Sequence, residues 1–441
     1  MKNTRVLIIS YYWPPSGGAG VQRWLKLTKY LGQNGIEPHV LTVHEDSASY
    51  MQWDESLVED VSAVVQVTKT KSFEPINYYS KLVGKKNVPT AGFANVDSTK
   101  LSQRAVNFLR SNLFIPDPRR GWNNYAYARA KEIIEREGIE LVITTSPPHS
   151  TQLIGLRLQK NLNVKWMADF RDPWTNIYYY ELFGHSWLSK RIDQSMERRV
   201  LQSADQIVTV SEGFKRSFGQ LVSGVEHKIK VITNGFDGED FEHLQKRTNS
   251  DFTISYTGTM SDQYDLSSFI RAMKKVQQYG EGVSVKLQMV GNLSVAIQEE
   301  ILAQNIPLEY IRMVPHSEVL QYQKNADLLL LIIPDTSDAN GIIPGKIFEY
   351  LASGNPIFCI GPPESDAAGI IDRCAVGQTM DRSNEQAMVR FLQEEIDRFK
   401  TKGPISSRVE EINSYSRESQ AATMAEVIRS LLERNNQKEG Y

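Results

Sequence analysis

Short apolar runs that alternate with amphipathic segments constrain the fold of this chain more than any other feature. One such amphipathic segment, Gly20–Asn34, carries Val21, Trp24 and Leu31 on one stripe, which is typical of a surface helix. The strand-like runs are Val6–Ser10, Pro38–Val43, Leu141–Thr145, Lys165–Asp169, Gln206–Val210, Lys230–Thr233, Thr253–Tyr256, Lys286–Val290, Leu328–Ile333 and Pro356–Ile360. Nearly continuous apolar strands separated by helices predict an α/β fold with parallel sheets covered on both faces.

The strand–helix series occurs twice, and the length of 441 residues suits two domains. A polar stretch, 236–251, separates the two series. We therefore expect two Rossmann-like domains, 1–240 and 251–413, which face each other across a cleft with ligands at the carboxyl ends of the strands. We expect the remaining 414–441 to form a C-terminal helix that packs back on the N-terminal domain.

Composition narrows the class of protein and its compartment. The formal net charge is −2, so the bulk charge gives no reason to expect a nucleic-acid partner. The only two cysteines, Cys359 and Cys374, are not spaced as a zinc site and favour a reducing compartment. The first apolar run is strand-length rather than a signal peptide, and no run approaches the roughly 20 apolar residues of a membrane span. We expect a cytoplasmic protein, either soluble or bound to the inner surface of the membrane.

The first candidate site is the loop after the first strand, residues 11–20. Gly17, Gly18 and Gly20 let backbone N–H groups approach a phosphate or a sugar just before a helix begins. The spacing does not meet the dinucleotide-binding fingerprint. A tight turn without a ligand is the alternative interpretation.

The second candidate site lies between Asn340 and Gly354, after an apolar strand. Gly345 precedes a helix whose first turn presents free N–H groups, and Lys346 places a cation where a diphosphate would lie. Glu349 is one turn further on, on the same face, where its carboxylate can accept hydrogen bonds from two ribose hydroxyls. The alternative is an ordinary surface pair of lysine and glutamate.

The third candidate site combines polar residues at two successive strand ends of the first half. His149 follows one strand, and Asp169, Arg171 and Asp172 follow the next. Such strand ends converge on one edge of a parallel sheet, where these groups suit proton handling or the orientation of a hydroxyl. In the alternative interpretation, Asp172 caps a turn and Arg171 pairs with Asp169.

Other chemistry is not indicated. The sequence contains neither a Walker loop nor a Gly-x-Ser-x-Gly elbow, and it has no His-Glu-x-x-His motif. No Asp-x-Asp pair is present to clamp a diphosphate through a metal ion. We therefore expect no metal and no cofactor.

Taken in order, these segments resemble the GT-B glycosyltransferases of the retaining family-4 type over nearly the whole length. The segments that carry the resemblance are Tyr12-Trp13-Pro14-Pro15 with Gly17-Gly18, Ser203 through Glu212, Val231 through Asp237, Tyr256-Thr257-Gly258, Met289-Val290-Gly291, Asn325-Ala326-Asp327, and Lys346 through Pro356. The resemblance implies a glycosyltransferase of the hexosyltransferase type that uses a nucleotide-sugar donor. It also implies that the first domain binds the acceptor and the second binds the donor.

The resemblance assigns donor-site residues in the second half. Glu349 matches the second glutamate of the family's paired signature, which holds the donor ribose, whereas Gly341 stands at the first glutamate. Thr259 stands where the family has a phosphate-binding arginine, so we expect Lys346 and the helix N-terminus to replace it. The remaining donor contacts implied by the resemblance are Gly258, Gly291, and the base-reading loop with Pro315 and His316.

On the acceptor side, the resemblance implies retention without an obvious nucleophile. His149 and Asp172 would then orient the acceptor, a glycan or a lipid-linked sugar of surface polysaccharide synthesis, with Asp169 and Arg171 in support. One alternative is a nucleotide-sugar epimerase or hydrolase of the same fold. Another is a catalytically silent partner subunit.

Residues 69–120 combine basic and aromatic side chains. Ten Lys and Arg residues stand against three acids there, with six interleaved aromatics, and Trp122 follows directly after the segment. This pattern suits contact with an anionic membrane surface, although a solvated insertion is an equal alternative.

Overall fold

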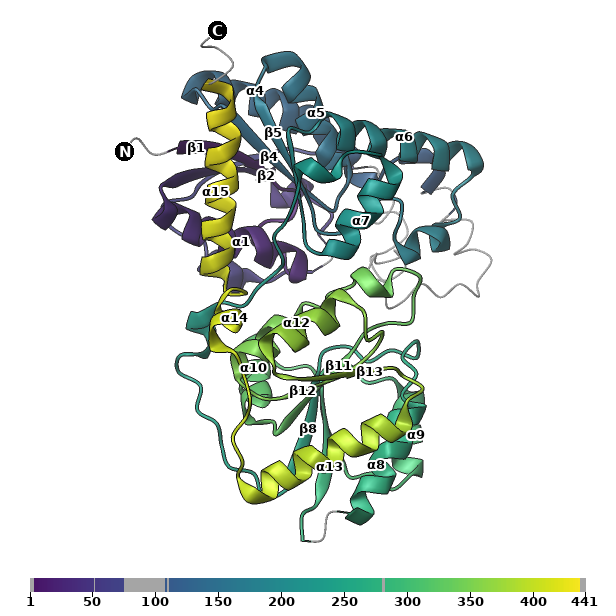
Figure 1. Cartoon of the computed structure of the whole chain (residues 1–441). Coiled ribbons are helices and arrows are strands. Elements are labelled where there is room, and N and C mark those ends of the chain that lie inside the picture. Colours follow the sequence, from purple (N-terminus) through teal and green to yellow (C-terminus); the bar gives the residue numbers. More distant parts are fainter. Residues whose placement is uncertain (1–3, 51, 75–107, 109–110, 280–281, 437–441) are drawn as a thin grey trace. The chain divides into compact units, whose positions relative to one another are not determined.

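The computed structural model describes residues 4–50, 52–74, 108, 111–279 and 282–436 (Figure 1). The chain forms two compact units. The first contains Met1–Thr233 and Arg417–Tyr441, and the second contains Asn234–Ser416. Over the described ranges, no helix is both long and apolar enough to cross a membrane.

The first unit is built on a seven-stranded parallel sheet with the order β3-β2-β1-β4-β5-β6-β7. Its strands are β1 (Thr4–Ile9), β2 (Ile36–Val43), β3 (Gln66–Thr70), β4 (Leu141–Ser146), β5 (Lys165–Phe170), β6 (Gln206–Thr209) and β7 (Ile229–Val231). Its helices are α1 (Ala19–Leu31), α4 (Asn123–Glu137), α5 (Ser150–Leu162), α6 (Trp187–Ser203), α7 (Glu212–Leu221) and α15 (Arg417–Asn436).

Alternate residues of each strand in this unit pack on opposite faces of the sheet. Val6 and Ile8 of β1 pack with α1 and α15, whereas Leu7 and Ile9 pack with α4 and α5. Helices α6 and α7 cover the same face as α4 and α5, over β5 and β6. Both faces are therefore buried, which explains why the strands read as continuous apolar runs.

The last helix, α15, belongs to the first unit although the second unit precedes it in sequence (Figure 1). Ala421, Met424 and Ile428 pack into the same cluster as the apolar side of α1. Arg429 adds a hydrogen bond from its guanidinium to the main-chain oxygen of Asn34. The helix thus completes one cover layer of the first sheet.

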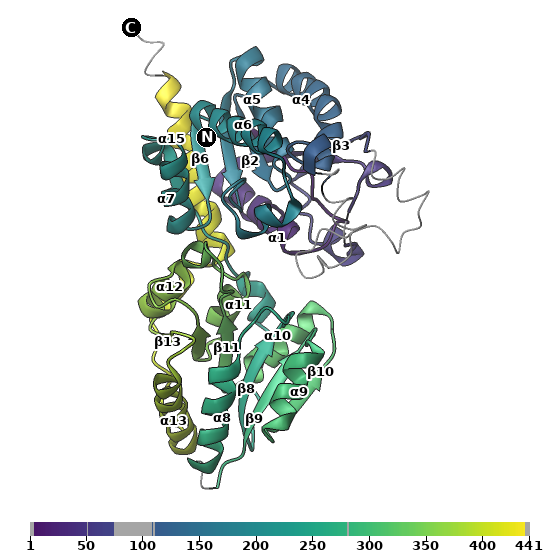
Figure 2. The same ribbon diagram turned by 90° about the vertical axis from the view of Figure 1, so that its right-hand side faces the viewer.

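The second unit has a six-stranded parallel sheet with the order β10-β9-β8-β11-β12-β13 (Figure 2). Its strands are β8 (Phe252–Thr257), β9 (Val285–Val290), β10 (Leu308–Ile311), β11 (Leu328–Ile332), β12 (Ile357–Ile360) and β13 (Gly377–Met380). Its helices are α8 (Ser267–Tyr279), α9 (Val295–Ala303), α10 (His316–Asn325), α11 (Lys346–Ser353), α12 (Asp366–Cys374), α13 (Glu385–Thr401) and α14 (Val409–Asn413).

Residues of β11 show the same two-sided burial in this unit. Leu328 and Leu330 face the cluster of α8, α9 and α13, and Leu329 and Leu331 face the cluster of α11 and α12. In each unit the strand order reverses beside the first strand, between β1 and β4 and between β8 and β11. Ligands of open α/β sheets bind at such reversals, outside the carboxyl ends of the strands.

The predicted α/β class with two Rossmann-like sheets is confirmed, and each of the ten predicted strands overlaps an observed one. Three further strands, β3, β10 and β13, were not predicted. All three lie at sheet edges. Much of the predicted membrane-contacting segment 69–120 lies outside the described residues.

Candidate active site

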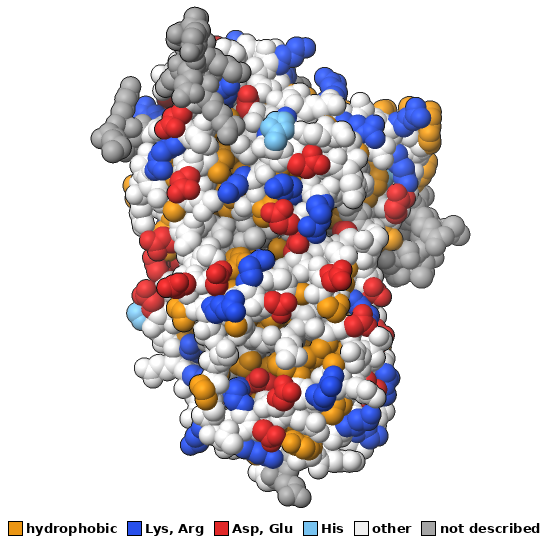
Figure 3. Space-filling model, viewed as in Figure 1, with side chains coloured by type: hydrophobic (Ala, Val, Ile, Leu, Met, Phe, Trp, Pro, Cys, Tyr) orange, Lys and Arg blue, Asp and Glu red, His pale blue; other side chains and the backbone are white. Residues whose placement is uncertain are grey.

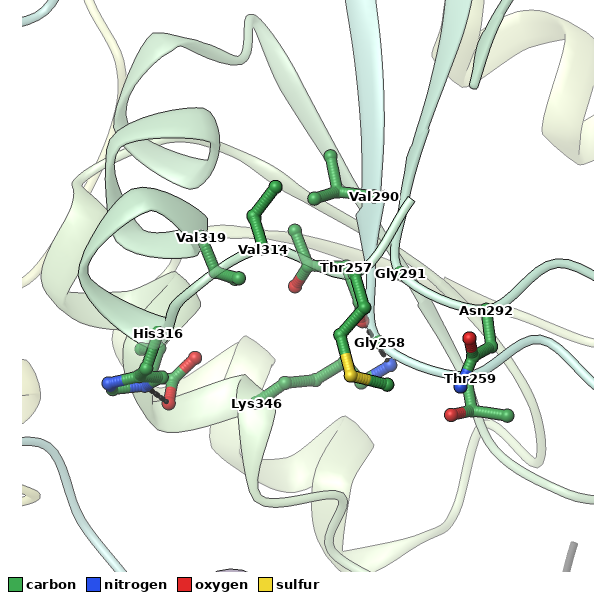
Figure 4. Close-up of a pocket in the computed structure, with 12 residues that line it drawn as sticks. Thr257, Gly258, Thr259, Val290, Gly291, Asn292, Val314, His316, Val319 and Lys346 are labelled. Atoms are coloured by element: carbon green, nitrogen blue, oxygen red, sulfur yellow. Dashed lines mark hydrogen bonds and ion pairs between the residues drawn. The ribbon is translucent and has the colours of Figure 1, made fainter. Parts of the chain in front are cut away.

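A pocket of about 260 Å³ opens at the carboxyl ends of β8 and β9 in the second unit (Figure 4). Two strand-end loops, the segment before α10, and the first turn of α11 surround it. The lining residues are Thr257, Gly258, Thr259, Val290, Gly291, Asn292, Met313, Val314, His316, Val319, Lys346 and Glu349. Of the predicted donor-site residues, Gly258, Thr259, Gly291, His316, Lys346 and Glu349 line this pocket.

Two glycines bring main-chain atoms to the pocket surface. Gly258 and Gly291 have φ angles of 110° and 124°, which side-chain-bearing residues rarely adopt. A Cβ atom on Gly291 would lie 2.4 Å from the main-chain oxygen of Gly258, so the two loops touch through backbone alone. A ligand can therefore approach the main chain of both loops closely.

Lys346, the first residue of α11, reaches back to the end of β8. Its Nζ atom donates a hydrogen bond of 2.6 Å to the main-chain oxygen of Thr257 and lies 3.8 Å from the centre of the Tyr256 ring. Removal of the ammonium from water lowers its pKa to about 7, although the charge of Glu349 opposes the shift. The ammonium of Lys346 thus titrates near neutral pH.

Glu349 lies one turn further along α11 and is held by two side chains of α10. His316 Nε2 lies 2.9 Å from its Oε1 atom, and Gln323 Nε2 donates to Oε2 at 2.8 Å. Burial raises the pKa of Glu349, but the hydrogen bonds from His316 and Gln323 and the charge of Lys346 outweigh it, so the pKa lies below its ordinary value. The carboxylate is ionised at neutral pH and fixed in direction.

Gln323, absent from the sequence prediction, connects the strand end to this carboxylate. Its amide also donates to Thr257 Oγ1 at 3.0 Å, and the side chain is fully buried. No signal in the sequence marked this residue, because only the packing of α10 shows which of its polar side chains are buried. Pro315 and Gly345, which were predicted, do not line the pocket but stand at the N-caps of α10 and α11.

In the first unit, Asp169 is fully buried at the end of β5 and engaged by three residues. Arg23 pairs with it at 3.0 Å, Trp24 Nε1 donates at 2.8 Å, and Thr145 Oγ1 donates at 2.7 Å. The partner of Asp169 is therefore Arg23 of α1, and not Arg171 as in the alternative interpretation above. These contacts give Asp169 a role in holding α1 to the sheet.

Arg171 ties together main-chain segments around the same strand ends. Its guanidinium donates to the oxygen atoms of Ser146 at 3.2 Å and Pro147 at 2.9 Å, and also to that of Gly20. A Cβ atom on Gly20 would lie 2.7 Å from the guanidinium. Gly20 thus serves the approach of Arg171.

His149 stacks on Trp174, with ring centres 5.2 Å apart and planes tilted by 10°. Burial, together with the charge of Arg171, lowers the pKa of His149 to about 3, so the ring is neutral at physiological pH. Its Nδ1 atom is buried, and no described residue hydrogen-bonds to it. Asp172 lies near this group after β5 and is half-buried.

Gly17 and Gly18 lie in the loop before α1, packed against the chain at Gln52. The N–H of Gly17 donates to the main-chain oxygen of Gln52 at 2.9 Å, and Gly18 has a φ of 93°. The four residues His149, Asp169, Arg171 and Asp172 share the ends of β4 and β5, as predicted from their strand-end positions.

Within the described residues, no cluster of His, Cys, Asp and Glu side chains could hold a metal ion.

Comparison with known proteins adds the decisive observation. Residues 88–240 match the model of Glycosyltransferase Family 4. A glycosyltransferase from Rickettsia africae has the same architecture, with 15% identity over 98% of this chain and 99% of that chain, and a TM-score of 0.58. The chain is a glycosyltransferase with the GT-B fold.

Two further solved structures share the fold of this glycosyltransferase. The sucrose-phosphate synthase of Thermosynechococcus elongatus has 12% identity, coverage of 98% of this chain and 100% of that chain, and a TM-score of 0.60. HepE of Anabaena, solved in complex with UDP-glucose, has 12% identity, coverage of 97% and 99%, and a TM-score of 0.60. No curated protein sequence matches this glycosyltransferase.

Proposed function

We propose that this glycosyltransferase takes its sugar from a nucleotide-sugar donor whose diphosphate and ribose bind in the pocket of the second unit. The observation that carries the proposal is the convergence of Lys346 and Glu349 on a pocket floored by Gly258 and Gly291. A cation beside accessible main chain can bind a diphosphate, and an ionised carboxylate can accept hydrogen bonds from the two neighbouring hydroxyls of a ribose. The UDP-glucose bound to HepE makes a uridine diphosphate donor the first candidate to test.

Lys346 would supply the charge that the donor diphosphate needs. Its ammonium has three N–H donors, of which the hydrogen bond to Thr257 uses one. The remaining donors can reach phosphate oxygens without loss of that anchor. The N–H groups of Ile347 and Phe348 in the first turn of α11 already donate to the main-chain oxygen atoms of Pro344 and Gly345 at 3.0 and 3.3 Å. The attraction would therefore rest on Lys346 rather than on free N–H groups at the helix start.

Glu349 would accept hydrogen bonds from the donor ribose. Each carboxylate oxygen has more than one lone pair, so the contacts with His316 and Gln323 leave capacity for hydroxyl donors. Because these two residues fix the carboxylate direction, the ribose would meet a preorganised acceptor. Val314, Pro315 and His316 would border the base.

We place the acceptor in the first unit, at the strand ends that carry His149 and Asp172. His149 stays neutral and offers an imidazole nitrogen, while the half-buried Asp172 offers a carboxylate. Arg171 and Asp169 would hold the surrounding loops in place. The acceptor would be a glycan or a lipid-linked sugar in surface polysaccharide synthesis, transferred with retention by electrostatic stabilisation rather than by a covalent nucleophile. Two buried, free cysteines suit a cytoplasmic setting.

Product analysis tests the transfer itself. The enzyme is incubated with a donor labelled in its sugar, with and without a lipid-linked glycan fraction, and the products are separated and the new anomeric centre examined by NMR. The proposal predicts label in the glycan, dependent on the acceptor and with retained configuration. Free labelled sugar or an epimerised donor, formed equally without acceptor, would instead identify a hydrolase or an epimerase.

A further inference from the structure

The start of α6 in the first unit exposes large apolar side chains to solvent. Trp187 is 69% exposed, Leu188 is 59% exposed and Ile192 is 38% exposed. Leu188 and Ile192 lie one helical turn apart, so they share a face. Figure 3 shows orange side chains beside blue ones along the upper right edge of the molecule, and Figure 1 draws α6 in that region.

Two neighbouring segments, one around Asn112 and one around Gly184, extend this surface. Asn112 joins them to α6: its Nδ2 atom donates to the oxygen of Gly184 at 3.3 Å, and its Oδ1 atom accepts from the N–H of Ser186 at 2.7 Å. Leu113 and Leu182 on these segments are 70% and 53% exposed. We call the whole surface the α6 patch, with Phe108, Leu113, Leu182, Trp187, Leu188 and Ile192 as its members.

The charges that α6 presents to solvent are positive. Arg191, Arg198 and Arg199 are exposed, and the guanidinium of Arg191 lies 4.7 Å from the centre of the Trp187 ring. The two acids of the helix, Asp193 and Glu197, are buried. They accept hydrogen bonds from Trp174, Thr175 and Tyr180 beneath the helix. The helix therefore turns its acids inward and its cations outward.

Next to the patch, the exposed acid Glu181 is neutralised by Lys190, with 2.5 Å between Nζ and Oε2. The remaining cations of α6 leave the surroundings of the patch positive. A second copy of the chain docked symmetrically on this surface would bring the arginines of both copies together, which disfavours self-association. A negatively charged surface is the partner that both features fit.

We propose that the α6 patch docks on an anionic lipid bilayer, with its apolar side chains in the headgroup region and its arginines against lipid phosphates. Tryptophan and aliphatic side chains bordered by Arg and Lys are the composition of interfacial membrane helices. The inference extends the proposal that the acceptor is lipid-linked, and its biological meaning rests on that proposal. It centres the membrane contact on the start of α6 and retains Phe108 and Leu113 from the predicted segment 69–120.

The test is co-sedimentation of the full-length protein with vesicles of phosphatidylcholine alone or mixed equally with phosphatidylglycerol. The wild type is expected to bind the mixed vesicles at low salt and to bind less as salt increases. The variant W187S/L188S/I192S is expected to bind at least about tenfold more weakly. The variant R198S/R199S is expected to lose about tenfold of its binding to mixed vesicles only.

The matched control is V295S/L302S, which removes comparably exposed apolar side chains, 69% and 51%, from α9 of the second unit and should bind like the wild type. Circular dichroism melting shows whether each variant is folded. Equal binding of W187S/L188S/I192S and wild type, or no binding of the wild type, would overturn the proposal. Light scattering that shows a dimer abolished by the same triple variant would identify a contact between copies instead. The assay contains no nucleotide sugar, so its failure would leave the donor-site proposal intact.

Discussion

The ammonium of Lys346 lies 2.6 Å from the main-chain oxygen of Thr257 and thereby joins the first turn of α11 to the end of β8. The contact lies at the point where the strand order of the second sheet reverses. Because burial removes water from the ammonium, the charged form of this lysine is disfavoured until an anion binds. Nucleotide binding should therefore be coupled to protonation of this side chain.

Donor binding should weaken as the pH rises above about 7. The pKa of Lys346 is about 7 without ligand, and a bound diphosphate should raise it because it stabilises the ammonium. Binding then takes up a proton wherever the free lysine is neutral, so Kd should rise about tenfold per pH unit above that value, up to the pKa of the complex. Titration calorimetry across this pH range measures Kd. Repeating it in buffers of different ionisation enthalpy measures the number of protons taken up on binding.

Lys346→Arg is the control for the pH experiment, because arginine stays charged throughout. Its Kd should be nearly independent of pH over the same range. An equally steep dependence in Lys346→Arg would assign the proton to another group, such as His316, and would contradict this account.

Gly291→Ala should destabilise the second unit. The new Cβ atom would meet the main-chain oxygen of Gly258 at 2.4 Å and would require a φ of 124°. Neither strain can be relieved by a side-chain rotation, so the free energy of unfolding should fall by about 1–3 kcal/mol or more. Gly345→Ala is the control, because a Cβ atom there meets nothing within 4 Å. Urea unfolding of both variants gives the comparison, and equal midpoints would refute the argument.

Asp169→Asn should destabilise the first unit because it leaves the buried guanidinium of Arg23 without its counter-charge. Loss of one partner of a buried ion pair costs about 3–5 kcal/mol. The exposed pair of Arg5 and Glu37 offers a contrast, since Glu37→Gln should lower the free energy of unfolding far less than Asp169→Asn does. Chemical denaturation measures both free energies. A small effect of Asp169→Asn would show that the pair does not hold α1 to the sheet.

Asp172→Asn should lower kcat with donor and acceptor both saturating. Asp172 is half-buried, and its charge lies beside Arg171 at the strand ends where we place the acceptor. A loss of about 100-fold is the scale of one positioned catalytic group. Turnover equal to that of the wild type in a folded variant would remove Asp172 from the acceptor site.

The central strands could be predicted from sequence because both faces of each sheet are buried. Leu328 to Ile332 pack alternately against helices on either side, which leaves a continuous apolar run. The three edge strands that were not predicted, β3, β10 and β13, lack that signal. β10 is half-buried throughout, and β3 carries an exposed residue at Gln66 and another at Lys69. An edge strand pairs on one side only, so its side chains need not be apolar.

The site was less predictable than the fold because its partners come from helices far away in sequence. Lys346 and Glu349 stood out since a glycine and a helix start preceded them. Nothing local marked Gln323 as the residue that orients Glu349, or Arg23 as the partner of Asp169. A buried polar residue within an amphipathic helix is visible only when the packing of the helix is known.

Calorimetric titration of the free enzyme with UDP, GDP and ADP tests the central claim most directly. The account predicts that one of these nucleotides binds the wild type. It predicts that Lys346→Met and Glu349→Gln each weaken that binding at least about tenfold, the scale of one lost charged hydrogen bond. Lys274→Met, which removes an exposed lysine of α8 bonded to Gln304, should bind like the wild type. Unchanged affinity in both pocket variants, or no binding of any nucleotide to the wild type, would contradict a donor site in this pocket.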